Sequence, residues 1–398
     1  MIEGQHTPTH RQPGTTSLSA PNPPHFKVAW LGHLEGKAHS DGLSTYTREA
    51  CSQLRRCGVE TILFHHEPST DQTTAIKVPT GFRFKTMRVP SPGSGAYLAG
   101  QLKRSHVDLV HVSISFSLLD WRLPEIAHQL GLPVIATFHV PYDRRPSWRS
   151  TVLNMIARAY APALSRYDQV IVFSQEHRQQ LIAAGVKPDV LAVIPNGVDI
   201  NRYSPGSSEF RSRSELQLLV TYMGRLDPEK NCDVLCSAWS EMDLPPRSLL
   251  LVVGSGSERK RLVRRFGSNR SIRFTGLVRS EAERVDMLRG TDVFIQPSAA
   301  EGLSLSLLES MSCGCCTLAT DAGSDGEVVS GAGIALDPLN LKPQLQLALQ
   351  ICIEHPDLRD KLGMLARQRV IEAYDIERNF ANLVAIYERL LGRQQPQP

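Results

Sequence analysis

Short apolar runs alternate with amphipathic stretches along most of the chain. In the first half, the apolar runs lie at residues 26–32, 59–64, 107–112, 133–139, 169–174 and 189–194. Runs of this length predict buried strands, and several of the stretches between them have the apolar spacing of helices. Strands that are apolar on both faces are typical of a parallel sheet with helices on both sides. We therefore predict a doubly wound α/β domain in this half.

The alternation stops at residues 195–215 and then begins again. The stretch is polar, contains Pro, Gly and Ser, and is typical of a linker. A second series of apolar runs follows at 217–224, 248–254, 272–276, 292–298 and 315–320. We predict two Rossmann-like domains, 26–205 and 206–375, facing each other across a cleft. We expect a disordered tail over 1–25, and a last helix at 376–392 that packs back near the first domain.

Composition excludes several classes of protein. Hydrophobic residues make up 41% and charged residues 21% of the 398 residues, and a net charge of +4 does not by itself indicate nucleic acid or an acidic membrane. No apolar run approaches the roughly 18–20 residues of a membrane span. The polar N-terminus lacks the apolar core of a secretory signal, so we expect a cytoplasmic protein whose eight cysteines are reduced. CGCC at 313–316 has no partner cluster for a metal site, and we interpret it as a buried turn into a strand.

Two cations follow the first predicted strand of the second domain. Gly224 ends that strand, and Arg225 and Lys230 flank Pro228, a residue favoured in the first turn of a helix. Two cations beside a helix N-terminus form a binding site for a diphosphate. The alternative is a pair of solvated surface cations beside two acidic neighbours.

Two glycines end the next predicted strand. Gly254 and Gly256 have no side chains, which lets the backbone approach a ligand closely. The pair is weak evidence by itself, because the third glycine of a dinucleotide-binding fingerprint is missing.

Glu301 and Glu309 stand eight residues apart after another predicted strand. If the intervening run is helical, eight residues advance about 12 Å and place both carboxylates on the same side, about one nucleotide-sugar apart. Gly302 permits the tight turn into this helix. Glu301 can then accept hydrogen bonds from sugar hydroxyls and Glu309 from ribose hydroxyls, while backbone N–H groups near Leu303 and Ser304 face a diphosphate. A plain strand with one capping Glu is the alternative, but it does not explain the glycine.

These motifs together resemble glycosyltransferase family 4, a family of retaining enzymes with the GT-B fold. The resemblance extends over residues 26–392. It is carried by four segments in the family's order and spacing, namely PNGVD at 195–199, GRLDPEKN at 224–231, VVGSGSE at 252–258 and PSAAEGLSLSLLESMSCG at 297–314.

The resemblance implies a donor and a mechanism. The donor is a nucleotide-sugar, UDP- or GDP-linked, that binds mainly to the second domain. Arg225 and Lys230 match the family's diphosphate ligands, Glu301 the ligand of the transferred sugar, and Glu309 the ribose ligand. The implied mechanism is a front-face displacement in which the leaving phosphate takes the acceptor proton, without a protein nucleophile, a metal ion or another cofactor.

The resemblance also implies a contribution from the first domain. His139 ends a predicted strand and is similar to the family's cleft histidine, with a purely structural histidine as the alternative. Residues 41–49 resemble the glycine-rich loop that approaches donor and acceptor. Gly42 is present in this loop, but Asp41 stands where many members have a first glycine.

Several segments are similar to bacterial-type digalactosyldiacylglycerol synthases, which add galactose to a glycolipid. They are HSDGLSTYTRE, IVFSQEHRQQL, ATDAGSDGEVV and EGLSLSLLESM. This resemblance implies a peripheral enzyme on an anionic membrane, which the basic and apolar residues of 144–160 can contact. An ordinary helix that covers the sheet explains the same residues.

Two rival functions differ in class. One is a soluble transferase that makes sucrose-like sugars or polysaccharide. The other is a nucleotide- or nucleic-acid-binding module without transfer activity, which uses the basic run at 259–273. Aromatic residues make up only 6% of the chain, which counts against base stacking, so we expect no nucleic acid partner.

Overall fold

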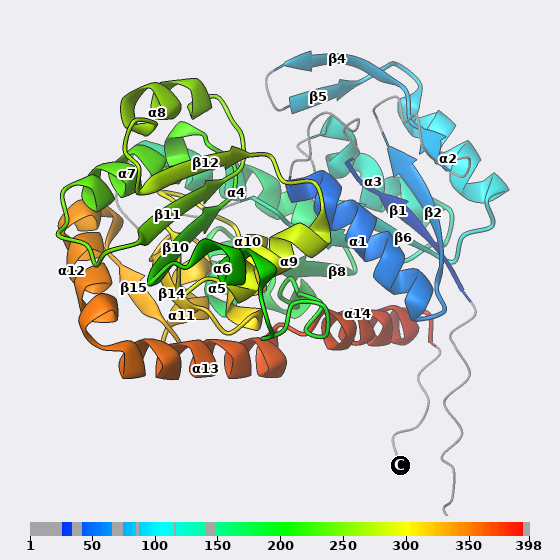
Figure 1. Cartoon of the computed structure of the whole chain (residues 1–398). Coiled ribbons are helices and arrows are strands. Elements are labelled where there is room, and N and C mark those ends of the chain that lie inside the picture. The colour runs from blue at the N-terminus through cyan, green and yellow to red at the C-terminus, as the bar shows by residue number, and fades with distance from the viewer. Residues whose placement is uncertain are drawn as a thin grey trace, which may run out of the picture.

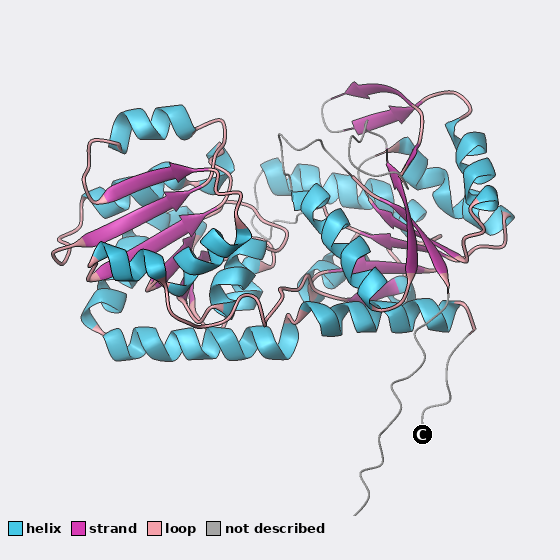
Figure 2. Ribbon diagram, turned by 45° about the vertical axis from the view of Figure 1, so that its right-hand side comes forward, coloured by secondary structure: helices cyan, strands magenta, loops and turns pink. Residues whose placement is uncertain are grey.

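The computed structural model describes residues 26–33, 42–65, 75–84, 87–114, 117–140 and 148–392. Two parallel sheets stand side by side, and helices cover both faces of each (Figure 1, Figure 2). This arrangement confirms the predicted α/β class with two Rossmann-like halves. The tail predicted at 1–25 lies outside the described residues.

The first half is built on a seven-stranded sheet with the order β3-β2-β1-β6-β7-β8-β9. Its strands are β1 (Lys27–Leu31), β2 (Glu60–His65), β3 (Ile76–Lys77), β6 (Leu109–Ser113), β7 (Val134–Thr137), β8 (Gln169–Val172) and β9 (Leu191–Val193). Its helices are α1 (Gly42–Arg56), α2 (Ser94–Arg104), α3 (Leu118–Gln129), α4 (Trp148–Leu164), α5 (Gln175–Ala183) and the 3₁₀ turn η1 (Pro188–Val190). An antiparallel hairpin is formed by β4 (Thr80–Phe84) and β5 (Met87–Pro90).

The second half is built on a six-stranded sheet with the order β12-β11-β10-β13-β14-β15. Its strands are β10 (Leu218–Met223), β11 (Ser248–Val253), β12 (Ile272–Gly276), β13 (Val293–Gln296), β14 (Cys316–Thr320) and β15 (Ile334–Leu336). Its helices are α6 (Glu209–Ser214), α7 (Cys232–Ser240), α8 (Arg259–Phe266), α9 (Glu281–Arg289), α10 (Leu305–Ser312), α11 (Asp325–Val329), α12 (Leu341–Glu354) and α13 (Pro356–Ala373). Two 3₁₀ turns, η2 (Pro228–Lys230) and η3 (Pro338–Asn340), and the final helix α14 (Ile376–Leu390) complete the described chain.

Burial explains why the central strands of the second half are largely apolar. Every residue of β10 and of β11 is buried, because helices pack on both faces of the sheet. A polar side chain in the middle of such a strand loses its hydration and needs a partner, which Thr221 has in the hydroxyl of Thr291 at 2.8 Å. The continuous apolar runs in the sequence therefore predict these strands well.

Each sheet contains a point where the strand order reverses. In the first sheet β1 lies between β2 and β6, and in the second sheet β10 lies between β11 and β13. The connections leave in opposite directions at these points, so a crevice opens at the carboxyl ends of the strands. The loops after β10 and β13 carry most of the predicted donor-binding residues, and the topology brings these two loops together.

The chain crosses between the halves at two places that touch each other. Val198 and Asp375 form an isolated parallel bridge, and the N–H of Val198 donates to the carbonyl of Tyr374 at 2.9 Å. A Cβ on Gly197 would lie 2.4 Å from Cα of Ile376, so this close approach requires glycine. The predicted linker is not irregular throughout, because residues 209–214 form α6. The boundary at 205 stays a prediction.

After the second crossing, α14 lies on the first sheet (Figure 1). Tyr387 of α14 is fully buried, and its hydroxyl lies 2.6 Å from Nδ1 of His111 on β6. Nε2 of His111 lies 2.7 Å from Oγ1 of Thr137, and the imidazole stacks on Trp30 with ring centroids 4.2 Å apart. Burial lowers the pKa of His111 to about 3, so its ring is neutral. Both ring nitrogens therefore have partners without a buried charge.

We expect the change Tyr387→Phe to destabilise the protein by about 1–3 kcal/mol, because it leaves a buried nitrogen of His111 without its partner. Differential scanning calorimetry should show a lower unfolding midpoint. The matched control is Tyr97→Phe on α2, where the side chain is exposed, and that midpoint should stay unchanged. Equal midpoints for the two variants would contradict this role of Tyr387.

Candidate active site

The loops after β10 and β13 form one unit at the crevice of the second sheet. The N–H of Ala299 donates to the carbonyl of Glu229 at 2.7 Å. The side-chain amide of Asn231 donates to the carbonyl of Pro297 at 3.0 Å. These bonds hold residues 225–231 against residues 297–301, so side chains from the two loops are positioned relative to each other.

Lys230 and Glu301 form an ion pair between these loops. Lys230 is only 8% exposed, and its ammonium contacts Oε1 of Glu301. The same oxygen accepts hydrogen bonds from Nε2 of Gln296 at 2.6 Å and from Oγ of Ser298 at 2.8 Å. Among the described residues, no donor reaches Oε2. One carboxylate oxygen is thus fixed by three donors, and the other is available to a ligand.

Arg225 does not join this pair. Its guanidinium is about half exposed and pairs with the carboxylates of Asp227 and, at 3.0 Å, Glu229. Asp227 in turn accepts hydrogen bonds from the N–H and hydroxyl of Ser257 at 2.9 Å. The structure therefore brings Lys230 together with Glu301 but holds Arg225 on acidic neighbours, so its predicted diphosphate role remains a prediction.

The predicted glycines have different structural reasons. Gly254 has φ +138°, and a Cβ there would lie 1.8 Å from the carbonyl oxygen of Gly224. Glycine is therefore needed at 254, where the ends of β10 and β11 approach each other, whereas the sequence analysis explained Gly254 by approach to a ligand. A Cβ on Gly224 would instead lie 2.8 Å from the hydroxyl of Tyr222. Gly302 does not have positive φ, and a Cβ there would meet nothing within 4 Å. The expected tight turn does not require this glycine, and open space lies in front of its backbone.

The run between the two glutamates is only partly helical. Helix α10 begins at Leu305, and Ser304 is its N-cap, with Oγ accepting the N–H of Leu307 at 3.3 Å. Glu301 lies on the preceding loop, and the helix begins two residues after Leu303, so the advance of about 12 Å for eight helical residues does not hold between the two glutamates. Leu303 is buried in the core of the second half. Within the described part of the chain, the two glutamates share no side-chain partner.

Glu309 lies in a separate polar cluster. Burial raises the pKa of Glu309 to about 7, Arg284 and the Tyr203 hydroxyl oppose this shift, and the charges of Glu281 and Glu49 add to it. Glu49 belongs to α1 of the first half, so charges from both halves affect the pKa of Glu309. A carboxyl group with this pKa gains or loses its proton close to neutral pH.

His139 is partly buried beside the end of β7. Its Nε2 lies 2.8 Å from Oγ of Ser113, and its ring meets the edge of Tyr46 with centroids 4.7 Å apart. Burial lowers the pKa of His139 to about 3, so the ring is neutral. Gly42 is the first residue of α1. The predicted glycine-rich loop is therefore helical from residue 42 onward, and Asp41 lies outside the described residues.

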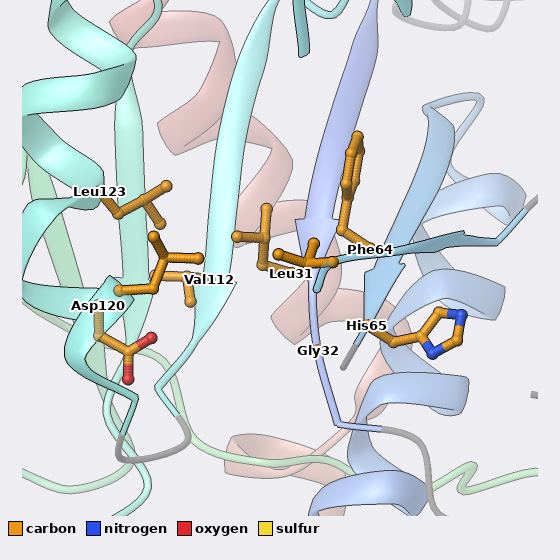
Figure 3. Close-up of a pocket in the computed structure, with 9 residues that line it drawn as sticks. Leu31, Gly32, Phe64, His65, Val112, Asp120 and Leu123 are labelled. Atoms are coloured by element: carbon orange, nitrogen blue, oxygen red, sulfur yellow. The ribbon is translucent and has the colours of Figure 1, made fainter. Parts of the chain in front are cut away.

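A pocket lies at the carboxyl ends of β1, β2 and β6 in the first half. Figure 3 shows His65 and Asp120 on opposite sides of it, with Leu31 and Phe64 between them. The sequence analysis did not single out these residues. Ligands of such sheets bind beyond the carboxyl ends of the strands at a switch point, and this rule applies to the first sheet as well. The rule could have indicated these residues from the sequence.

Three further polar residues of the donor side were also missed. Gln296 and Ser298 end a strand that is otherwise apolar, which is a sign of a buried polar contact. Asp325 is fully buried, although nothing in its local sequence indicates this. Among the described residues, no group of three or more His, Cys, Asp or Glu side chains is arranged for a metal ion. None of the helices in the described part of the chain is both long and apolar enough to cross a membrane.

Two family descriptions match consecutive parts of the chain. Glycosyltransferase Family 4 matches residues 40–202, and Glycosyl transferases group 1 matches residues 217–353. The chain belongs to glycosyltransferase family 4. It is therefore an enzyme that transfers a glycosyl group, as the sequence motifs predicted.

Among relatives of this family 4 glycosyltransferase is the D-inositol 3-phosphate glycosyltransferase of Kineococcus radiotolerans. The two are 26% identical over 388 residues, which cover 84% of this chain and 87% of the relative.

Solved structures confirm the GT-B fold. HepE of Anabaena, in complex with UDP-glucose, has a TM-score of 0.70 and 17% identity, and the match covers 92% of this chain and 100% of that chain. WaaG, a glycosyltransferase involved in lipopolysaccharide biosynthesis, has a TM-score of 0.68 and 18% identity, with 90% and 99% covered.

The raised pKa of Glu309 predicts a pH-dependent effect of the change Glu309→Gln on stability. Well below pH 4.5 the carboxyl is protonated in both the folded and the unfolded state, whereas above pH 7 it is charged in a half-buried site. Wild-type stability should therefore fall as pH rises through this range. We expect the variant to raise the unfolding midpoint by about 2–4 °C at pH 8 and by little at pH 4.5.

Thermal unfolding at the two pH values measures this effect. Glu354→Gln, on the exposed surface of α12, is the matched control and should shift the midpoint equally at both. A Glu309→Gln effect that does not change with pH would contradict the burial of an ionisable group there.

Proposed function

We propose that this glycosyltransferase moves a hexose from a nucleotide-sugar to an acceptor with retention of configuration at the anomeric carbon. The observation that carries the proposal is the Lys230–Glu301 pair at the switch point of the second sheet, with Oε2 of Glu301 open to a ligand. The pair supplies one cation for a diphosphate and one acceptor for sugar hydroxyls. Family membership supports the same assignment of the two residues.

In this proposal Lys230 stabilises the leaving group. Negative charge develops on the diphosphate as the bond to the sugar breaks, and a nearly buried ammonium interacts with that charge more strongly than an exposed one. Oε1 of Glu301 accepts three hydrogen bonds, which holds the carboxylate in one orientation. Oε2 can then select and align the hydroxyls of the hexose. The departing phosphate takes the acceptor proton, so no protein nucleophile is required.

The ribose and acceptor sides complete the proposal. Glu309 accepts hydrogen bonds from ribose hydroxyls, and Arg225 joins the diphosphate by leaving its acidic neighbours. His139, which is neutral, contributes a hydrogen bond from the first half. We propose UDP as the carrier, because HepE has been solved with UDP-glucose and has the same fold. GDP is the alternative carrier.

The change Lys230→Ala should lower kcat by about 10²–10³, because one group that stabilises the leaving charge is lost. Release of UDP from a panel of UDP-hexoses, followed by mass spectrometry, measures this rate without an identified acceptor. Lys342→Ala, which removes an exposed lysine from α12, is the matched control and should keep the wild-type rate.

Near-normal UDP release by folded Lys230→Ala would remove Lys230 from the site. If the wild-type enzyme releases no nucleotide from any UDP- or GDP-hexose, the donor class itself is wrong.

We propose a glycolipid as the acceptor, with galactosyl-diacylglycerol as the candidate from the segments similar to digalactosyldiacylglycerol synthases. The relative described above is named for D-inositol 3-phosphate instead, so a soluble phosphorylated acceptor is the main alternative. WaaG, which is involved in lipopolysaccharide biosynthesis, gives the lipid-linked class some support. A soluble transferase for sucrose-like sugars or polysaccharide remains the third candidate.

A basic surface of the second half supports a membrane-bound acceptor. The segment 259–279 contains eight Arg and Lys residues and no Asp or Glu, although the whole chain has a net charge of only +4. Among the described residues, only Arg261 of this segment forms ion pairs, with Glu258 and Asp233. Val263 and Leu277 add exposed apolar side chains. The segment comprises α8 and the edge strand β12, which lie together at the outside of the second sheet (Figure 1).

Helix α4 gives weaker support for membrane contact. Met155 is 56% exposed, and Val152 and Arg158 are also exposed. Ile156 and Ala157 pack against the core of the first half, as expected for an ordinary helix that covers a sheet. Residues 144–147 of the predicted surface segment lie outside the described residues.

The double change Arg264→Gln/Arg265→Gln in the last turn of α8 should weaken binding to anionic vesicles. Each cation near such a surface contributes about 1 kcal/mol, so the two changes should reduce binding about 30-fold. Co-sedimentation with phosphatidylglycerol vesicles at low and high salt measures this loss, and phosphatidylcholine vesicles show the binding that charge does not explain.

The double change Lys103→Gln/Arg104→Gln is the matched control, because it removes two exposed cations from the last turn of α2. Equal losses in the two variants would mean that only net charge matters. Undiminished binding after the α8 change would exclude this surface as the membrane contact.

A further inference from the structure

A buried carboxyl group beneath Glu301 has no role in the proposed chemistry. Asp325 begins α11, and its side chain is fully buried. Its Oδ1 accepts the N–H of Ser304 at 2.9 Å, whereas Oδ2 has no hydrogen-bond partner among the described residues. A buried oxygen without a donor is costly, and such groups in native structures usually have a functional reason.

The loop that carries Glu301 rests directly on the loop before Asp325. The N–H of Ser324 donates to the carbonyl of Gly302 at 2.9 Å. Gly323 has φ +60°, and a Cβ there would lie 1.9 Å from the carbonyl oxygen of Glu301. Together with the Asp325–Ser304 bond, these contacts hold residues 301–304 against residues 323–325. The position of the Glu301 carboxylate therefore depends on this support as well as on Lys230.

The surroundings of Asp325 favour its uncharged form. Burial and the charge of Glu301 raise its pKa well above the ordinary value, and Lys230 and the bond from Ser304 offset this only in part. The strands that pack against α11, β14 and β15, contain no Asp, Glu, His, Lys or Arg. Lys230 is the cation that acts on both carboxyl groups, and its contact is with Glu301. Arg369 of α13 donates to the carbonyls of Val328 and Ser330, at the other end of α11.

We propose that Asp325 is a positioning residue for Glu301, which fixes the 301–304 loop through Ser304. This inference rests on the proposed role of Glu301 in holding the transferred sugar. A charged Asp325 would repel the Glu301 carboxylate and attract the ammonium that the diphosphate requires. The uncharged acid keeps the anchor and leaves the Lys230–Glu301 pair undisturbed until the donor binds.

The test compares Asp325→Asn with Asp325→Ala in the full-length enzyme. The amide of Asn has the shape of the neutral acid and can accept the same N–H, so kcat for UDP release should stay within about threefold of wild type. Alanine removes the anchor, and a misplaced Glu301 should lower kcat about 10–100-fold while the KM for the donor changes less than threefold. Asp337→Ala is the matched control, because Asp337 also accepts a backbone N–H, from Leu339 at 2.9 Å, and its loss should leave kcat unchanged.

A double-mutant cycle with Glu301→Gln separates positioning from general damage. If Asp325 acts through Glu301, then Asp325→Ala should lower kcat little further in an enzyme that already carries Glu301→Gln. If the two residues act independently, their fold-reductions of kcat should multiply. Multiplying effects would overturn the inference, and so would an Asp325→Asn variant that is as slow as Asp325→Ala. If Asp325→Ala does not fold, Asp325→Asn alone still tests the inference. A folded Asp325→Asn variant whose kcat is below one-tenth of the wild-type value overturns the inference. Failure of wild type to release nucleotide would instead refute the proposed function.

Discussion

The ion pair of Lys230 and Glu301 is the interaction on which the donor side depends. It joins a loop after β10 to a loop after β13, the two strands that meet at the switch point of the second sheet. Removing two charges from water costs more than an isolated pair recovers unless further hydrogen bonds assist. Gln296 and Ser298 supply these bonds to the same carboxylate oxygen. The pair therefore gives little support for a role in stability. Oε2 of Glu301, which has no donor among the described residues, is better explained by a ligand.

The two halves carry different polar groups. The second half supplies the cation and the carboxylates, whereas the first half supplies a neutral histidine and the pocket between His65 and Asp120. Coupling between the halves is visible at Glu309, whose pKa responds to Glu49 of α1. The chain crosses between the halves at the paired segments around Val198 and Asp375, and α14 then packs on the first sheet. Its buried Tyr387–His111 contact fixes that helix on the first sheet without introducing charge.

The sequence was sufficient to predict the α/β fold class, because buried parallel strands appear in it as continuous apolar runs. It also located Lys230 and Glu301, because each lies just after such a run. It did not predict their mutual contact, since a spacing along the chain does not show which loops meet across a sheet. The advance calculated for eight helical residues between Glu301 and Glu309 does not hold for a related reason. Ser304 is the N-cap of α10, because its hydroxyl accepts the N–H of Leu307, three residues later. A count of the eight residues between the glutamates does not take this N-cap into account.

Buried acids show how the site balances stability against function. Glu309 and Asp325 both have pKa values raised by burial, so each destabilises the fold when it is charged. Apolar residues at these positions would avoid that cost, and natural proteins retain such groups mainly where a ligand needs them. The two acids differ in exposure, however, because Glu309 is reachable from solvent and Asp325 is not. The first is suited to contact a ligand directly, and the second can act only through the loop above it.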